Sequence, residues 1–280
     1  PDVPDLDEVR SRADELLAFN PDPLPFTDEA SEDEVRRAWK RWLQSHHSFF
    51  FNFALLSYSY DRLLDALDTP GASSQKIWAD RISALWKAGG GLMRYGCDFE
   101  PLRLIYEGRI RVAMPPAFSG FWLREWEVLR AKLPVWQNIV VQKSTAELAA
   151  LDRTIKAGFG VYSEHHDYVI HAAVTNGKSL AQDYAKQRRC LYHITEADFK
   201  VYDDWFLISR VEGLTRTEFM NTACDTFRDT LIELGAGHRL ATAVIEEITG
   251  GVRAGVDIFR EWLVPATEGS RYYSKSTVRD

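Results

Sequence analysis

Apolar residues recur at three- and four-residue steps along most of the chain, which is the spacing of amphipathic helices. A first, acidic helix of this kind is expected within residues 1–19. A much longer helix is predicted from the capping box Ser31–Glu34 to about Leu67, where the turn sequence Asp68–Gly71 ends it. From His46 onward this helix is almost wholly apolar, and a helix that is apolar on all sides lies at the centre of a fold.

Later helices are indicated by polar residues that can cap a helix. Their expected starts are Ser74, Ser144, Ser179, Thr195 and Thr215. The helix from Ser74 is predicted to break or bend at the triple glycine 89–91. Its expected inward positions are Ile77, Ile82, Leu85 and Trp86. Residues 135–141 fit a strand and a buried helix equally well.

The pattern as a whole predicts an all-α fold with one helical domain over residues 1–280. Within it, residues 1–30 are expected to form an N-terminal arm and residues 265–280 a polar tail. A chain of 280 residues that is 45% hydrophobic is long enough to bury a large core.

One histidine, His238, is predicted to open an amphipathic helix near the C-terminus. The apolar face of this helix is expected to contain Ala241, Val244, Ile245 and Ile248. The helix is predicted to end in a glycine-rich turn, Thr249–Gly251. An imidazole at this place can bind a metal through one nitrogen, or it can be a hydrogen-bonded residue at the start of a helix.

A second histidine begins an aromatic stripe on the long apolar helix. The stripe consists of His47, Phe51, Ala54 and Tyr58, which share one face at helical spacing. Such a face can form the wall of a pocket for a flat ligand, or it can be ordinary core. Aromatic residues make up 12% of the chain, which suits both interpretations.

Three segments together resemble the tryptophan 2,3-dioxygenase family, a superfamily of histidine-ligated haem oxygenases that act on aromatic metabolites. One is the order of His238, an amphipathic helix, Thr249-Gly250-Gly251 and then Gly255-Val256. Another is the long helix with its histidine and phenylalanines, and the third is Ser119-Gly120-Phe121 before a helix that carries an arginine.

The resemblance implies the helical fold of that family and a haem b cofactor with His238 as the axial ligand of the iron. It also implies that Thr249, Gly250 and Gly251 lie close to haem and substrate. Oxygen or hydrogen peroxide is the expected co-substrate.

The resemblance also implies roles in substrate binding and proton transfer. Phe51 and Tyr58 are expected to contact the aromatic ring, and Arg124 is expected to bind a carboxylate, for which a guanidinium has the matching geometry. His47 or its neighbour His46 is the expected distal acid–base group. Leu55 or Ser57 stands where the family has its distal histidine, which indicates a relative of the dioxygenase rather than the dioxygenase itself.

The function expected from this resemblance is ring hydroxylation of a tyrosine-like amino acid on a biosynthetic path. Oxygenation of indole or tryptophan is the first alternative. A non-haem iron enzyme is a second, because Asp167 and His171 are four residues apart and share a helical face. A helical binding protein without catalysis is a third. Asp203 and Asp204 weakly resemble a magnesium–diphosphate motif, but a solvated helix face explains them as well.

Charge and cysteine content narrow the possible partners. A net charge of −7 argues against binding to nucleic acid, whose phosphates require a basic surface. Three widely spaced cysteines form neither a disulfide framework nor a zinc motif, which favours a reducing, cytoplasmic setting. We expect no membrane partner, a small aromatic substrate and a homo-oligomer.

Overall fold

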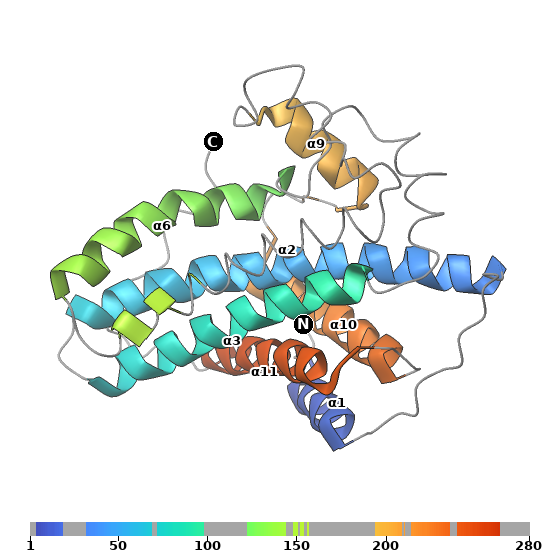
Figure 1. Ribbon diagram of the computed structural model, residues 1–280, viewed down its shortest axis with the longest axis horizontal. Helices are drawn as coiled ribbons and strands as arrows, with labels where there is room; N and C mark the ends of the chain where they lie inside the picture. The colour runs from blue at the N-terminus through green and yellow to red at the C-terminus, as the bar shows by residue number, and fades with distance from the viewer. Residues whose placement is uncertain are drawn as a thin grey trace.

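Helices make up the architecture of the described part of the chain (Figure 1). The computed structural model describes residues 4–18, 32–68, 72–97, 122–143, 148–150, 152–153, 156, 194–208, 210, 214–235 and 240–263. The long helices are α1 (Leu6–Ala18), α2 (Glu32–Asp68), α3 (Ala72–Cys97), α6 (Arg124–Lys143), α9 (Glu196–Trp205), α10 (Arg216–Gly235) and α11 (Thr242–Leu263). No strand occurs in these residues, and the prediction of a single all-α domain is confirmed.

The helix α2 is the axis of the arrangement. It runs along the molecule with α6 and α9 above it in Figure 1, and with α3, α10, α11 and α1 below it. It begins and ends within one residue of the predicted limits. Its second half contributes the fully buried side chains Leu55, Leu56 and Leu63. The prediction that the apolar half of this helix is central is therefore confirmed.

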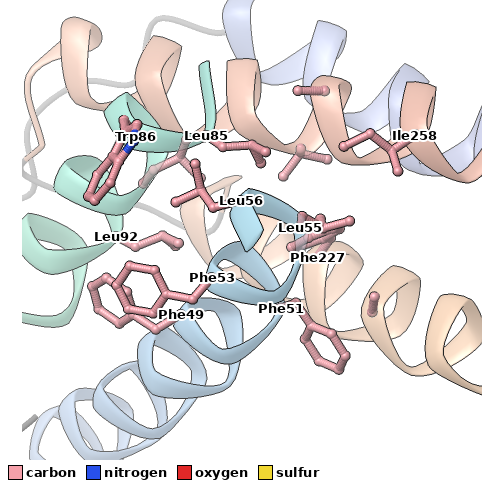
Figure 2. Close-up of a cluster of buried hydrophobic side chains, with 14 of the residues drawn as sticks. Phe49, Phe51, Phe53, Leu55, Leu56, Leu85, Trp86, Leu92, Phe227 and Ile258 are labelled. Carbon is pink, nitrogen blue, oxygen red and sulfur yellow. The ribbon is translucent and has the colours of Figure 1, made fainter. Parts of the chain in front are cut away.

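The core lies where α2 meets α3, α10 and α11. Figure 2 shows Phe51 and Leu55 of α2 beside Phe227 of α10, and Leu56 beside Leu85 of α3. Trp86 of α3 is also buried and its indole N–H donates to the hydroxyl of Tyr60 at 2.9 Å. Burial of a leucine or phenylalanine side chain contributes about 1.5–3 kcal/mol, so this cluster is a main source of stability.

Reciprocal hydrogen bonds close the N-termini of two helices at the predicted places. The Thr195 hydroxyl accepts from the Asp198 amide and the Asp198 carboxylate accepts from the Thr195 amide, which is a capping box. Thr215 and Glu218 form the same pair of bonds at the start of α10. Each cap satisfies backbone donors that have no partner within the helix.

The glycines that were predicted to interrupt two helices do not do so. The helix α3 runs without a break through residues 89–91, and α11 runs through Thr249–Gly251. The predicted break in α3 and the predicted end of the later helix at Thr249–Gly251 are therefore wrong. Gly91 and Gly251 instead face a neighbouring helix. A Cβ on Gly251 would lie 2.1 Å from the Cβ of Ala88, and one on Gly91 would lie 2.8 Å from Cγ1 of Ile248. The bare α-carbons thus allow α3 and α11 to pack backbone against backbone.

Other local predictions are corrected as well. Residues 135–141 belong to the helix α6, which continues past Pro134, and so the alternative of a strand is wrong. Ile77 is 47% exposed and Ala241 is exposed, although both were predicted to face the core. Within the predicted N-terminal arm, α1 packs against α10 and α11 through Leu6, Val9, Ala13 and Leu16.

No helix in the described residues has both the length and the apolar content to span a membrane.

Candidate functional site

The candidate site lies where the end of α9 reaches the first half of α2. Two ion pairs join the α9 region to α6, one at each end of that region, and each pairs an arginine with a carboxylate. Arg124 of α6 donates to both oxygens of Glu196 at 2.9 and 2.7 Å, and Arg210 donates to both oxygens of Glu125 at 2.6 and 3.1 Å. Bidentate pairs of this kind fix orientation as well as distance. They hold the helix α9 at a defined place beside α2.

The chain leaves α9 in a tight turn, Phe206–Ile208, which we call the exit turn. The amide of Phe206 donates to the Tyr202 carbonyl at 3.0 Å, and the amide of Ile208 donates to the Asp203 carbonyl at 2.8 Å. Leu207 between them has φ of 54° and is 76% exposed. A positive φ is unfavourable for a leucine, so the surrounding contacts determine this conformation.

The exit turn contacts both predicted histidines of α2. The carbonyl of Phe206 lies 2.5 Å from Nε2 of His47, and since a carbonyl only accepts, His47 donates this hydrogen bond. The phenyl ring of Phe206 stacks on the imidazole of His46, with ring centres 3.9 Å apart and planes within 9° of parallel. The two neighbouring imidazoles are therefore held by one residue from a distant part of the chain.

His46 is held from its own helix as well. Its Nδ1 lies 2.7 Å from the carbonyl of Trp42, one helical turn earlier, and it donates to that oxygen. The indole of Trp42 packs against the imidazole at 4.6 Å, and the ring of Tyr202 lies 6.3 Å away. Burial raises the pKa of the Tyr202 phenol well above its ordinary value, and the carboxylates of Glu125 and Asp203 raise it further. This phenol stays neutral beside His46.

An ion-pair network fixes the chain just after the exit turn. Besides Glu125, Arg210 binds Asp203, to which its Nη2 donates at 2.9 Å. Burial alone would lower the pKa of the Arg210 guanidinium, but the hydrogen bonds to Glu125 and Asp203 raise it above the ordinary value. Arg210 thus stays charged and joins α9, α6 and the segment after the exit turn.

The predicted aromatic stripe of α2 does not form one wall. His47 reaches the exit turn, whereas Phe51 is 5% exposed and packs against Phe219 and Phe227 of α10, at 5.2 and 6.3 Å. Tyr58 lies farther along α2, between Trp78 of α3 and Trp262 of α11. These side chains share one helical face, but each contacts a different neighbour.

Arg124 is already engaged by a carboxylate of the protein. Besides its bidentate pair with Glu196, its guanidinium lies 4.6 Å from the ring centre of Phe199. The hydrogen bond from Arg124 lowers the pKa of the Glu196 carboxyl below its ordinary value. A substrate carboxylate would have to replace Glu196 to reach this guanidinium. On the same helix, Glu127 pairs with Arg130, whose Nε donates to it at 2.9 Å.

An open surface depression of about 510 Å³ lies beside these ion pairs. It is lined by Arg124, Glu196, Ala197, Lys200, Asp203, Asp204, Ile208 and Arg210. Its cations and carboxylates are paired with one another, since Lys200 also binds Asp204 at 2.8 Å. Asp203 and Asp204 therefore have cationic partners in the protein, which favours the solvated-face interpretation over a magnesium–diphosphate motif. Neither histidine of α2 lines this depression.

The predicted haem-contact residues of α11 lie inside an unbroken helix. Thr249 is fully buried, and its hydroxyl donates to the Ile245 carbonyl at 2.8 Å. The Cβ side of Gly251 is filled by Ala88 of α3, whereas that of Gly250 is open. Of the three residues, only Gly250 leaves room on its Cβ side for another group.

The predicted iron ligand His238, and also Asp167 and His171, lie outside the described residues. Within the described residues, no group of three or more His, Cys, Asp or Glu side chains could hold a metal ion. A haem iron needs only one such ligand from the protein. A single axial histidine is compatible with this finding.

Sequence reasoning found both histidines of α2 but missed Phe206 and Trp42. Trp42 lies four residues before His46, so helical spacing could have indicated it. Phe206 gave no such signal, because it is 159 residues from His47 and acts partly through its backbone carbonyl.

Comparison with protein families identifies the chain. Residues 6–158, more than half of its length, match the model of the family described as SfmD 3-methyl-L-tyrosine peroxygenase. The chain belongs to this family. No curated protein matches the chain significantly. The matched region contains α1, α2, α3 and α6, and with them His46 and His47.

Family membership confirms several predictions. A peroxygenase is an oxidoreductase that transfers an oxygen atom from a peroxide to its substrate, and so the prediction of an oxygenase is confirmed. The predicted class of a haem-dependent oxygenase for a tyrosine derivative in biosynthesis is confirmed in the same way. The closer relation to the tryptophan 2,3-dioxygenase superfamily stays a prediction.

Proposed function

We propose that this protein hydroxylates the aromatic ring of a tyrosine derivative with hydrogen peroxide as the oxygen donor and haem b as the cofactor. The family match supports the reaction and the substrate class, because its description specifies a peroxygenase and 3-methyl-L-tyrosine. The amino-acid substrate is a small aromatic molecule whose phenol activates the ring toward an electrophilic oxygen. Tryptophan and free indole are the second choice.

His238 is the proposed ligand of the haem iron. A neutral imidazole is one of the protein donors that bind haem iron, so its chemistry fits the group. When bound, the haem supplies the oxygen-transfer chemistry, while the protein positions the substrate and limits the access of water. Thr249, Gly250 and Gly251 are the proposed neighbours of the cofactor, and the open side of Gly250 supports that role for this residue.

His47 is the proposed acid–base group, with His46 as its neighbour. As the O–O bond of a peroxide breaks, one oxygen must lose a proton and the other must gain one. A neutral imidazole with one lone pair can take the first proton and return it. The observation that carries this role is the hydrogen bond from Nε2 of His47 to the Phe206 carbonyl. This bond leaves the other ring nitrogen as the acceptor.

The substrate contacts are proposed on α2 and α6. Phe51 and Tyr58 are aromatic side chains of the helix that carries His47, and they are the proposed contacts of the ring. Arg124 is the proposed partner of the amino-acid carboxylate. Its bidentate pair with Glu196 supports this role, because a substrate carboxylate can take the same geometry when it replaces Glu196.

The cofactor proposal is tested by the visible absorption spectrum of the purified protein. We expect a Soret band that collapses in His238→Ala, together with loss of bound haem. Iron without a Soret band that is lost in His171→Ala would instead support the non-haem alternative. Absence of both would favour a binding protein.

The reaction is tested with isotopically labelled hydrogen peroxide and, separately, labelled oxygen gas. We expect 3-methyl-L-tyrosine to gain one labelled hydroxyl group from the peroxide, and tyrosine to react more slowly. We expect His47→Gln to lower kcat by roughly a hundredfold, the usual contribution of a positioned acid–base group. Incorporation of the label from oxygen gas alone would contradict the proposed co-substrate.

A further inference from the structure

The exit turn of α9 determines which nitrogen of His47 can act as a base. A neutral imidazole carries its proton on one of two nitrogens, and a hydrogen bond to a fixed acceptor selects between them. The Phe206 carbonyl lies 2.5 Å from Nε2 of His47, so the proton is on Nε2. Nδ1 makes no hydrogen bond with any described residue, and it carries the lone pair.

We propose that the exit turn Phe206–Ile208 is a positioning element that fixes His47 in its Nε2–H tautomer, so that Nδ1 takes the proton during turnover. This inference rests on the function proposed above, because it names the atom through which His47 acts. Phe206 and Leu207 are positioning residues, since they act through the imidazole of His47.

The neighbouring histidine supports the choice of His47. His46 donates from Nδ1 to the Trp42 carbonyl within its own helix, and its ring stacks on Phe206 and lies tilted against Trp42. The conformation of His46 is therefore set both by α2 and by the ring of Phe206. The hydrogen bond of His47 instead crosses from α2 to the exit turn. The described acceptor at Nδ1 of His46 thus belongs to α2, whereas the acceptor at Nε2 of His47 belongs to the exit turn.

Two features hold the carbonyl of Phe206 in place. The amides of Phe206 and Ile208 bond back into α9, and Arg210 clamps the following segment to Asp203 and Glu125. Between them lies Leu207, which has φ of 54° and whose amide shares a peptide plane with the Phe206 carbonyl. The leucine side chain is 76% exposed, so substitution there acts through the backbone with little loss of packing.

Leu207 therefore offers a direct test. Leu207→Val places a β-branched residue at a positive φ, which such side chains strongly disfavour, whereas Leu207→Gly accepts that φ freely. Leu214→Val is a matched control, because Leu214 is an exposed leucine outside the exit turn. The tautomer of His47 is read by nitrogen NMR of the imidazole in the diamagnetic ferrous carbonyl form of the holoprotein. The signal that disappears in His47→Gln provides the assignment.

We expect an Nε2–H signal for His47 in the wild type, in Leu207→Gly and in Leu214→Val. In Leu207→Val we expect this signal to be lost or mixed with the other tautomer. We also expect kcat for peroxide-dependent hydroxylation to fall about tenfold in this variant with KM unchanged, because the base is misaligned while the substrate still binds.

An Nδ1–H tautomer in the wild type would overturn the inference, as would an unchanged His47 signal in Leu207→Val. A changed signal without a fall in kcat would also overturn it. Failure of the proposed function has a different signature. In that case the Nε2–H tautomer and its response to Leu207→Val persist, but His47→Gln hydroxylates 3-methyl-L-tyrosine at the wild-type rate.

Discussion

The helix α11 is bound on one side by α3 and on another by α1, and the two contacts differ in kind. Against α3, Gly251 lies beside Ala88 and Gly91 lies beside Ile248, so close that neither glycine has room for a Cβ. An ion pair such as Arg94–Glu247 lies at the edge of this contact.

Against α1, a narrow apolar stripe is accompanied by a series of ion pairs between the helices. They are Arg10–Asp257, Arg253–Asp14 and Arg260–Asp7, with Arg228–Glu8 joining α1 to α10. The comparison teaches that one helix can be held by close backbone contact on one side and by an apolar stripe flanked by ion pairs on another. The two sides should therefore respond to different perturbations.

The largest effect is expected where backbones touch. Gly251→Ala places a methyl group on Ala88, and we expect the free energy of unfolding to fall by about 2–3 kcal/mol, as in other overpacked cores. Urea unfolding measures the change. Gly250→Ala is the matched control, because its Cβ would meet open space and alanine favours a helix by up to about 1 kcal/mol.

A second substitution makes this prediction sharper. Ala88→Gly in the Gly251→Ala background removes the opposing methyl group and should restore most of the lost stability. If Gly251→Ala proves as stable as Gly250→Ala, the close approach of α3 and α11 is wrong.

A smaller effect is expected at alkaline pH. Burial raises the pKa of the Tyr60 and Tyr95 phenols above the usual range of tyrosine. Above about pH 10 the unfolded chain loses phenolic protons that the folded protein keeps, so the free energy of unfolding falls as pH rises, by ~1 kcal/mol per pH unit for each such group. Urea unfolding at a series of pH values measures this slope.

Tyr60→Phe provides the control for the alkaline prediction. It should flatten the slope above pH 10, while it lowers stability at neutral pH by about 1 kcal/mol through loss of the hydrogen bond from Trp86. The ion pairs of α1 contain no tyrosine and should add nothing to this slope. A slope that is equal in the wild type and in Tyr60→Phe would contradict the prediction.

The smallest effect on stability is expected at the contact of α1. Arg253→Ala or Arg260→Ala removes one partly exposed ion pair, and each should cost at most about 1 kcal/mol, less at high salt. Arg36→Ala, which breaks only pairs within the first turn of α2, is the control.

Local opening of this contact can be followed through Cys224 of α10. Its thiol is buried close to Asp5 and Arg228, and burial raises its pKa to about 12. In a background that lacks Cys97 and Cys190, we expect a thiol reagent to label Cys224 slowly at neutral pH. Salt, Arg253→Ala and Arg260→Ala should each accelerate labelling several-fold. A labelling rate that does not change with salt or with either substitution would show that these ion pairs do not hold α1 in place.

The sequence predicted the course of the chain better than the contacts between its helices. The limits of α2 follow from the patterns Ser31–Glu34 and Asp68–Gly71, each of which consists of consecutive residues, so local rules suffice. The glycines of α3 and α11 carry no such information. A glycine can end a helix, or it can allow a neighbouring helix to approach closely. The partner residue that decides between these outcomes is more than 150 residues away in sequence.

The candidate site shows the same limit. His46 and His47 could be found because polar residues stand out in an apolar stretch. The residues of the aromatic stripe do share one face of a helix, as predicted. Their contacts differ, however, because each packs against a different part of the protein outside α2. The partner of Arg124 could not be foreseen either, because Glu196 opens a helix 72 residues later.

The acceptor for His47 belongs to the main chain, and this has a practical consequence for mutagenesis. Every amino acid at position 206 brings the same carbonyl oxygen, so no codon change there deletes it. An alanine scan would therefore measure only the effect of losing the phenyl ring and would not test the carbonyl oxygen. Chemical protein synthesis that replaces the amide between residues 206 and 207 with a thioamide would weaken this acceptor while leaving every side chain in place.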